Sequence, residues 1–273
     1  MKIILFLLLT LYTYAQTRIV TLSPAVNEIV YALGFGEDVV GNTQYCTFPK
    51  ASQSVTKVGG YFSPNLEKIL SLKPSIVIMQ QNNKKLALRL NKLGVETKTI
   101  QIDRLPHIRN AILELGTLLH KETKAKSIVA DIDKALVDIN GIIKDKKILI
   151  VIGHNTELVK QIFVVGQNLY LDDIINASGN TNALQSKRKG QPILNQENII
   201  ATNPDIVVLL AHSMHQRGLT PADLIDPWKE LPINAGKSGD IYIIDKEYSG
   251  IPSDRLVLFL RDFRKILNAS KNR

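Results

Sequence analysis

The chain has 273 residues, a formal net charge of +9 and a single cysteine, Cys46. One thiol excludes an internal disulfide and any metal site built from several cysteines. The lysines are scattered along the chain, which is typical of solvated surfaces that weakly attract an acidic partner and does not indicate nucleic-acid binding.

The first 15 residues have the pattern of a secretory signal peptide. Lys2 precedes a short apolar run that ends in the small residues Thr13 and Ala15, so cleavage is expected after Ala15. An uncleaved membrane anchor is the alternative, but the run is shorter than the ~20 apolar residues that span a bilayer. No cysteine follows the run, which argues against a lipoprotein signal. We therefore predict export, with residues 1–15 removed.

Residues 16–104 alternate strand and helix signals, and they predict an N-terminal α/β lobe. The segment 75–79 is continuously apolar, as expected of a strand that is covered on both faces in a parallel sheet. Strands are expected at 18–22, 39–43, 75–79 and 95–102, and helices at 27–33, 65–73 and 86–93.

Residues 105–144 carry no strand signal. Apolar residues recur at helical spacing, first from Ile108 to Leu119 and then from Ile128 to Ile139. This pattern predicts two helices, the second of them long and ending near Gly141. Between two lobes, a long helix would act as a stiff spine.

Residues 145–273 predict a second α/β lobe. It starts with a strand at 146–152 and ends with an amphipathic helix at 252–267. Between these we expect strands at 205–209 and 240–245, a helix at 169–175 and a short helix that begins at Trp228.

Two segments half a sequence apart resemble each other. At one constant offset, Asn65, Glu67 and Pro74 correspond to Asn195, Glu197 and Pro204, and an apolar strand follows each proline. A repeat of such long period predicts two lobes of similar build rather than a solenoid. Two lobes create a cleft, and clefts between domains are preferred ligand sites.

In their order and spacing, these motifs resemble the periplasmic substrate-binding proteins of ABC importers for metal chelates, namely cobalamin, ferric siderophores and haem. The resemblance covers almost the whole chain after residue 15. It rests on residues 18–24 with Asn27 and Glu28, on 65–69 with 72–74, on the helices of 106–143, on 196–199 with 203–206, and on 253–256.

The resemblance implies a monomeric periplasmic protein with two parallel-sheet α/β lobes, a long rigid helix between them and a ligand cleft. It further implies delivery of the chelate to an inner-membrane ABC permease, without catalysis and without a cofactor. One exposed glutamate per lobe docks into arginine pockets of the permease in that family, and Glu67 and Glu197 match these positions. The alternative is that both are ordinary glutamates favoured by the helix dipole.

Ligand contacts are expected on loops at the carboxyl ends of strands, where the lobes meet. The resemblance places aromatic residues of cobalamin binders at Tyr61, Phe163 and Tyr248, and rings can hold a planar macrocycle over a large area. A tryptophan would be expected where this chain has Gln191, which weakens a cobalamin assignment. The candidate ligand-binding residues are Ser23, Pro24, Tyr45, Tyr61, Phe62, Phe163, Gln191, His212 and Tyr248.

Several polar residues leave alternatives open. Arg188 and Lys189 would suit carboxylates or catecholates, or they form a solvated loop. His212 and His215, with His154, could ligate haem iron or a bare ion such as nickel or zinc, but loop histidines without a role are commoner, and no metal site is assigned. A secreted hydrolase is the remaining alternative, although the chain has no phosphate loop, nucleophile elbow or metalloprotease motif.

Overall fold

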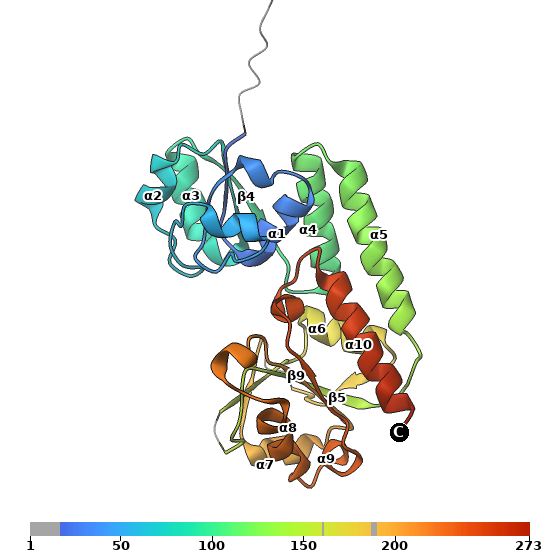
Figure 1. Ribbon diagram of the computed structural model, residues 1–273. Helices are drawn as coiled ribbons and strands as arrows, with labels where there is room; N and C mark the ends of the chain where they lie inside the picture. Colours follow the sequence, from blue (N-terminus) through green and yellow to red (C-terminus); the bar gives the residue numbers. More distant parts are fainter. Residues whose placement is uncertain (1–16, 160, 187–189) are drawn as a thin grey trace, which may run out of the picture.

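The computed structural model describes residues 17–159, 161–186 and 190–273. The predicted signal peptide, 1–15, and the basic residues Arg188 and Lys189 lie outside this described part. Figure 1 shows two lobes, one above the other, with long helices along one side of both. The α/β class and the two-lobed build are as predicted.

The N-terminal lobe contains a purely parallel sheet in the order β2-β1-β3-β4. Along β3, Ile76 and Ile78 belong to one hydrophobic cluster, and Val77 and Met79 belong to another on the opposite face. Burial on both faces explains the continuous apolar run. The elements are β1 (Ile19–Thr21), α1 (Pro24–Ala32), β2 (Val39–Asn42), α2 (Leu66–Ser71), β3 (Ile76–Gln80), α3 (Lys84–Lys92) and β4 (Glu96–Ile100).

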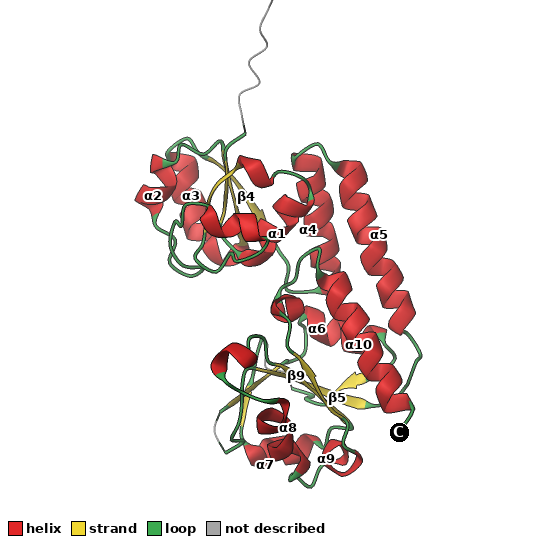
Figure 2. Ribbon diagram, in the orientation of Figure 1, coloured by secondary structure: helices red, strands yellow, loops and turns green. Residues whose placement is uncertain are grey.

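The two predicted helices of this segment are α4 (Leu105–Leu118) and α5 (Glu122–Ile139), which pack against each other. Gly116 allows them to approach closely, because a Cβ atom at this position would collide with Ala125. At 1.5 Å per residue, α5 is about 27 Å long, and it runs beside both lobes in Figure 2. Its buried residues Val129, Ile132 and Ile139 join a core that continues into the C-terminal helix α10 (Leu256–Lys271).

The C-terminal sheet is mixed, whereas the sequence predicted parallel strands. Its order is β10-β9-β5-β6-β8, with β7 also paired to β5. The short strands β6 and β8 are antiparallel to their neighbours, and the other pairs are parallel. The strands are β5 (Lys147–Ile152), β6 (Ile162–Val164), β7 (Thr181–Asn182), β8 (Ile193–Leu194), β9 (Ile206–Leu210) and β10 (Ile241–Ile244).

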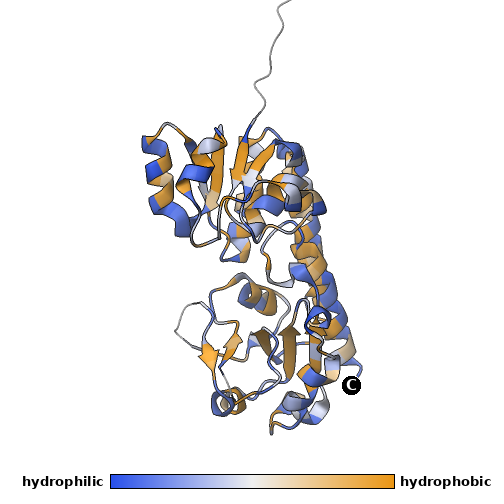
Figure 3. Cartoon of the chain, turned by 60° about the vertical axis from the view of Figure 1, so that its left-hand side comes forward, coloured by the Kyte–Doolittle hydropathy of each residue, from blue (hydrophilic) through white to orange (hydrophobic). Residues whose placement is uncertain are grey.

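The helices of this lobe differ from prediction in three places, one of which is the short helix at Asn234–Ser238 that was not predicted. The predicted helix start at Trp228 is wrong: Trp228 lies near the end of α8, which begins earlier because Thr220 and Asp223 form a capping box ahead of it. The last helix begins at Leu256 rather than at Pro252. The helices are α6 (Tyr170–Ala177), α7 (Gln196–Thr202), α8 (Pro221–Lys229), α9 (Asn234–Ser238) and α10. In Figure 3 the strands of both lobes are hydrophobic, while the outer helices are mixed.

The repeated segments fold alike. Asn65 caps α2 by accepting a hydrogen bond from Lys68 N (2.8 Å), and Asn195 caps α7 in the same way. Each helix is followed by a residue with left-handed backbone, Lys73 (φ 46°) and Asn203 (φ 42°), directly before the proline. The chain then enters a buried strand, β3 or β9. The repeat therefore reflects one helix-turn-strand unit used once in each lobe.

Candidate functional site

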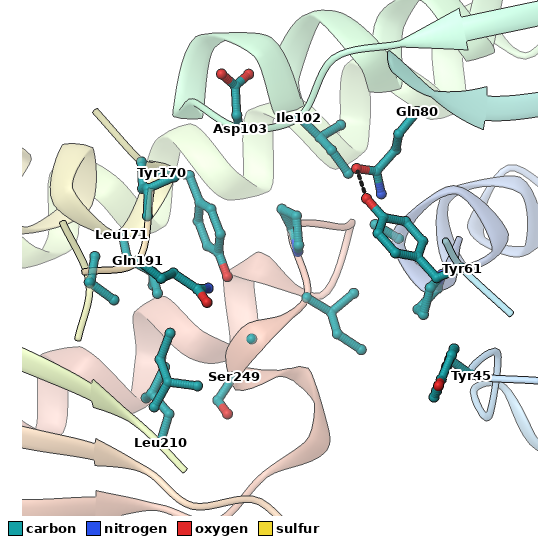
Figure 4. Close-up of a pocket in the computed structure, with 18 of the residues that line it drawn as sticks. Tyr45, Tyr61, Gln80, Ile102, Asp103, Tyr170, Leu171, Gln191, Leu210 and Ser249 are labelled. Atoms are coloured by element: carbon teal, nitrogen blue, oxygen red, sulfur yellow. Dashed lines mark hydrogen bonds between the residues drawn. The ribbon is translucent and has the colours of Figure 1, made fainter. Parts of the chain in front are cut away.

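A cavity of about 1000 Å³ lies between the lobes. Much of its described lining comes from residues at or after the carboxyl ends of β1, β3, β4, β5, β9 and β10, where an α/β sheet is expected to bind ligands. Figure 4 shows Tyr45 and Tyr61 on one side of the cavity, and Tyr170, Leu171 and Gln191 on the other. The volume lies at the upper end of the range of roughly 300–1,000 Å³ for small-molecule sites.

Three aromatic residues of the N-terminal lobe line one side. The Tyr61 hydroxyl donates a hydrogen bond to Gln80 Oε1 (2.9 Å), drawn as the dashed line in Figure 4. Burial raises the pKa of Tyr61, so the phenol keeps the proton that it donates. Phe62 packs edge-on against Tyr61 with ring centroids 4.6 Å apart, yet it is 84% exposed, and Tyr45 is 55% exposed. Exposed rings at a cavity wall are available to a ligand.

Amide side chains are the largest group in the described polar lining. Gln80 is the last residue of β3, Gln81 follows it directly, and Gln101 directly follows β4. Gln81 Nε2 donates to Gln101 Oε1 (3.0 Å), which ties the two strand ends together. Gln191 of the C-terminal lobe lines the side of the cavity opposite to Gln80 in Figure 4. Amides both donate and accept hydrogen bonds, so this wall suits a ligand with uncharged polar groups.

Two histidines line the cavity from the C-terminal lobe. His154 follows β5 in a turn at Gly153 (φ 112°), and His212 lies shortly after β9. His154 Nε2 lies 2.7 Å from the His212 carbonyl oxygen. His215 is not among the described lining residues, and its Nε2 faces Asp245 Oδ2 at 3.5 Å.

The described lining carries little charge. Asp103 and Glu247 are its ionisable acids, and none of its described residues is a lysine or an arginine. The Glu247 carboxylate accepts a hydrogen bond from Arg255 Nη1 (2.8 Å), which balances its charge. A polyanionic ligand would therefore find no cation among these side chains.

Six of the nine predicted ligand residues line the cavity, and three do not. Ser23 is fully buried, and its hydroxyl accepts a hydrogen bond from Val26 N as the cap of α1. Phe163 is 45% exposed on β6 but lies outside the described lining. Tyr248 donates its hydroxyl hydrogen to Asp262 Oδ2 (2.6 Å) on α10, and burial with this bond raises its pKa to about 12. The six that line the cavity are Pro24, Tyr45, Tyr61, Phe62, Gln191 and His212.

Several lining residues were missed by the sequence analysis. The rule that ligands bind at strand ends would have selected Gln80, Gln81 and Asn82, because the strand before them was predicted. Gln101 was not selected as a strand-end residue, because the predicted strand ran to residue 102, whereas β4 ends at Ile100. Tyr170 opens α6 and gave no local signal of its position in the cavity.

The two predicted docking glutamates occupy equivalent places. Glu67 is the second residue of α2, and Glu197 is the second residue of α7. Both side chains are exposed, and neither lines the cavity. Their position is compatible with a docking role and also with simple stabilisation of the helix N-terminus.

Ion pairs join the lobes beside the cavity. Glu28 of α1 accepts hydrogen bonds from Arg255 Nε (3.0 Å) and from Ser253 Oγ (2.5 Å), both from the C-terminal lobe. Glu28 and Arg255 are buried. At the start of α4, Arg104 Nε donates to Asp173 Oδ2 (2.8 Å) on α6. The lobes are therefore held together by charged contacts in addition to the helices.

The periplasmic binding protein family matches residues 19–248 of this chain. Because the match covers most of the chain, the protein belongs to this family, and the resemblance inferred from its motifs is confirmed. Within the described residues, no helix is long and apolar enough to cross a membrane.

Individual relatives carry different names. An uncharacterised ABC transporter substrate-binding lipoprotein, YvrC of Bacillus subtilis (strain 168), is 28% identical over 255 residues, which are 88% of this chain and 76% of the relative. The vitamin B12-binding protein of Salmonella paratyphi A is 25% identical over 211 residues, 75% of this chain and 76% of the relative. The periplasmic heme-binding protein RhuT from Roseiflexus sp. RS-1, solved in apo form, has a TM-score of 0.76 at 22% identity and covers 94% of this chain and 99% of its own.

Proposed function

We propose that this protein captures a metal chelate in the cavity between its lobes and delivers it to an ABC permease. The observation that carries the proposal is the cavity itself: it is large, it is lined by side chains from both lobes, and it combines aromatic rings with amides. Family membership supports transport rather than catalysis, since the family consists of periplasmic binding proteins. Cobalamin, a ferric siderophore and haem are the candidate ligands.

The lining favours a chelate with an uncharged periphery. Amides such as Gln80, Gln101 and Gln191 can pair with the amide side chains of a corrinoid, and the described lining offers no cation to a catecholate. A bare metal ion has less support, because the described residues contain no group of three or more His, Cys, Asp or Glu that could hold one. We therefore expect cobalamin to bind more tightly than a ferric tris-catecholate.

Calorimetric titration of the purified protein tests this order. Cyanocobalamin, haemin, a ferric tris-catecholate, and nickel and zinc salts are titrated separately. One-to-one binding of a chelate, without turnover, supports the proposal. Tight binding of a bare metal ion with no chelate bound would overturn it. Calorimetry is preferable to tryptophan fluorescence, because Trp228 is fully buried and does not line the cavity.

The organisation of the chain follows from the same proposal. We propose a signal peptide at 1–15, an N-terminal lobe at 16–104, a helical spine at 105–144 and a C-terminal lobe at 145–273, acting as a periplasmic monomer. The core cluster on one face of β3, which contains Val77 and Met79, lies wholly within residues 16–104 and supports the first lobe as a unit. Mass spectrometry of the exported protein tests the cleavage site, and a mature chain beginning at Met1 would contradict it.

A further inference from the structure

We infer that His154 supplies an axial ligand to the metal of the bound chelate. The inference deepens the proposed function and rests on it. It starts from the one histidine of the cavity whose ring is held by a hydrogen bond of its own: His154 Nε2 lies 2.7 Å from the backbone oxygen of His212. His154 is half-buried and lines the cavity.

The contact with the carbonyl defines which nitrogen carries the proton. A backbone carbonyl oxygen only accepts hydrogen bonds, so Nε2 must be the donor. In the neutral imidazole, Nδ1 then has no proton and keeps its lone pair. Histidines that ligate metals typically donate their other ring N–H to a carbonyl or a carboxylate, which orients the ring and makes the ligating nitrogen more basic. His154 already has this arrangement.

The backbone around His154 supports a defined position. Gly153 N donates to Leu210 O (3.1 Å), so the end of β5 is attached to the end of β9. The carbonyl that accepts from His154 follows this same strand end by two residues. The imidazole is therefore anchored to two central strands, on which precise sites are more easily held than on free loops.

One imidazole suits a chelated metal better than a free one. The described residues contain no cluster of three or more metal-ligating side chains, so His154 would leave most positions of a bare ion empty. In a corrinoid or a porphyrin the macrocycle fills the equatorial positions, and only axial positions are exchangeable. The expected step is a ligand exchange without redox change: the Nδ1 lone pair forms a bond to the metal, and the water bound there leaves.

The other two histidines of these loops provide matched controls. His212 also lines the cavity, but its contribution to the His154 contact is its backbone oxygen, which survives truncation of the side chain. His215 lies outside the described lining and faces Asp245. His154→Gln keeps an N–H donor for the carbonyl but removes the imidazole, so it separates coordination from folding.

The experiment compares pairs of probes that differ at the axial position. Aquocobalamin carries an exchangeable water, whereas cyanocobalamin carries cyanide, which imidazole does not displace. Haemin is paired with metal-free protoporphyrin IX in the same way. Binding is measured by calorimetry, and the visible absorption spectrum reports coordination by nitrogen.

For wild type we expect aquocobalamin, or haemin, to bind about tenfold or more tightly than its partner probe and to change its spectrum on binding. His154→Ala and His154→Gln should lose this preference and the spectral change, so that affinity falls much more for aquocobalamin or haemin than for cyanocobalamin or protoporphyrin. His215→Ala should behave as wild type, and His212→Ala, whatever its effect on affinity through the cavity wall, should keep the spectral change. Added imidazole should restore the spectral change in His154→Ala.

Two results would overturn the inference. One is a wild-type spectrum identical to that of His154→Ala, and the other is loss of the spectral change in His212→Ala alone. In both cases cyanocobalamin or protoporphyrin would still bind, and the proposed function would stand. Failure of all four probes to bind would instead remove the proposed function and this inference with it.

Discussion

Tyr61 is positioned by its own hydroxyl group, because the bond to Gln80 orients the ring at the cavity wall. The sequence placed Tyr61 in a loop after two glycines, and the structure adds the reason for its orientation. A ring held in this way can bury apolar area against a ligand without losing many rotamers on binding.

Tyr61→Ala should weaken binding of the preferred chelate by about 1–3 kcal/mol, the range for losing a buried aromatic contact. Tyr61→Phe keeps the ring and loses only the bond to Gln80, so a cost of about 1 kcal/mol or less is expected. Phe163→Ala is the matched control, because Phe163 is an exposed ring outside the cavity lining. Titration calorimetry measures all three, and an equal loss for Tyr61→Ala and Phe163→Ala would contradict the assignment.

At the scale of elements, local signals predicted most of the molecule. The apolar runs of β3 and β9 and the asparagine caps of α2 and α7 are encoded within about 15 residues of sequence, and they were recognised twice because the unit is repeated. The short strands β6 and β8 were missed, because two or three residues carry too little pattern and their pairing depends on partners far away in sequence.

The cavity was predicted less completely for the same reason. Pro24, Tyr45 and Tyr61 lie on loops that could be placed from neighbouring strands, whereas Tyr170 enters the cavity only because α6 packs at the start of α4. Tyr248 looked equivalent to Tyr61 in sequence. In the structure its hydroxyl donates a hydrogen bond to Asp262 on α10, and Tyr248 does not line the cavity. Tertiary packing decides which of these side chains line the cavity, and a single sequence does not reveal that packing.

The segment directly before α10 contains a half-buried acid, Asp254, that predicts a pH effect. Burial and the nearby negative charge of Glu28 raise its pKa from 3.8 to about 6, and its Oδ1 atom has no hydrogen-bond partner among the described residues. The folded protein therefore binds a proton at a higher pH than the unfolded chain does. Ionised Asp254 destabilises the fold above pH 6, and this cost disappears as the pH falls from 6 to 4.

Asp254→Asn should accordingly raise the free energy of unfolding at pH 7 by up to about 3 kcal/mol, and by much less at pH 4. Urea denaturation at both pH values gives the difference between variant and wild type, which isolates this group from the other acids. Asp131→Asn, on the exposed face of α5, is the control and should change stability little at either pH. A gain of equal size at pH 4 and pH 7 would show that ionisation is not its cause.

At the scale of the whole molecule, the two lobes enclose one cavity, the helix α5 runs along both, and each lobe carries one of two equivalent glutamates, Glu67 and Glu197. The ion pairs Glu28–Arg255 and Arg104–Asp173 join the lobes near the cavity, and α5 runs beside both. The buried pair Glu28–Arg255 opposes any movement that separates these two side chains, because breaking a buried ion pair is costly. The protein is thus expected to present nearly the same outer surface with and without ligand, so that Glu67 and Glu197 keep a constant separation.

Constant separation suits recognition by a permease with two fixed arginine pockets, since a carboxylate can form paired bonds with a guanidinium. Glu67→Arg and Glu197→Arg should each abolish uptake into proteoliposomes that contain the cognate permease and ATPase, because cation then faces cation. Affinity for the chelate should stay within about twofold, as neither residue lines the cavity. Glu122→Arg is the matched control: Glu122 is likewise exposed in a first helical turn, that of α5.

All three reversals lose a favourable interaction with a helix N-terminus, so each should cost a similar ~0.3–1 kcal/mol of stability. Only the two in the repeated segments should stop uptake. If Glu122→Arg impaired uptake equally, the effect would come from the helix ends and not from docking. If Glu67→Arg or Glu197→Arg weakened chelate binding while uptake per bound chelate stayed normal, that glutamate would belong to the ligand site, and the equivalence of the two repeats would have a purely structural origin.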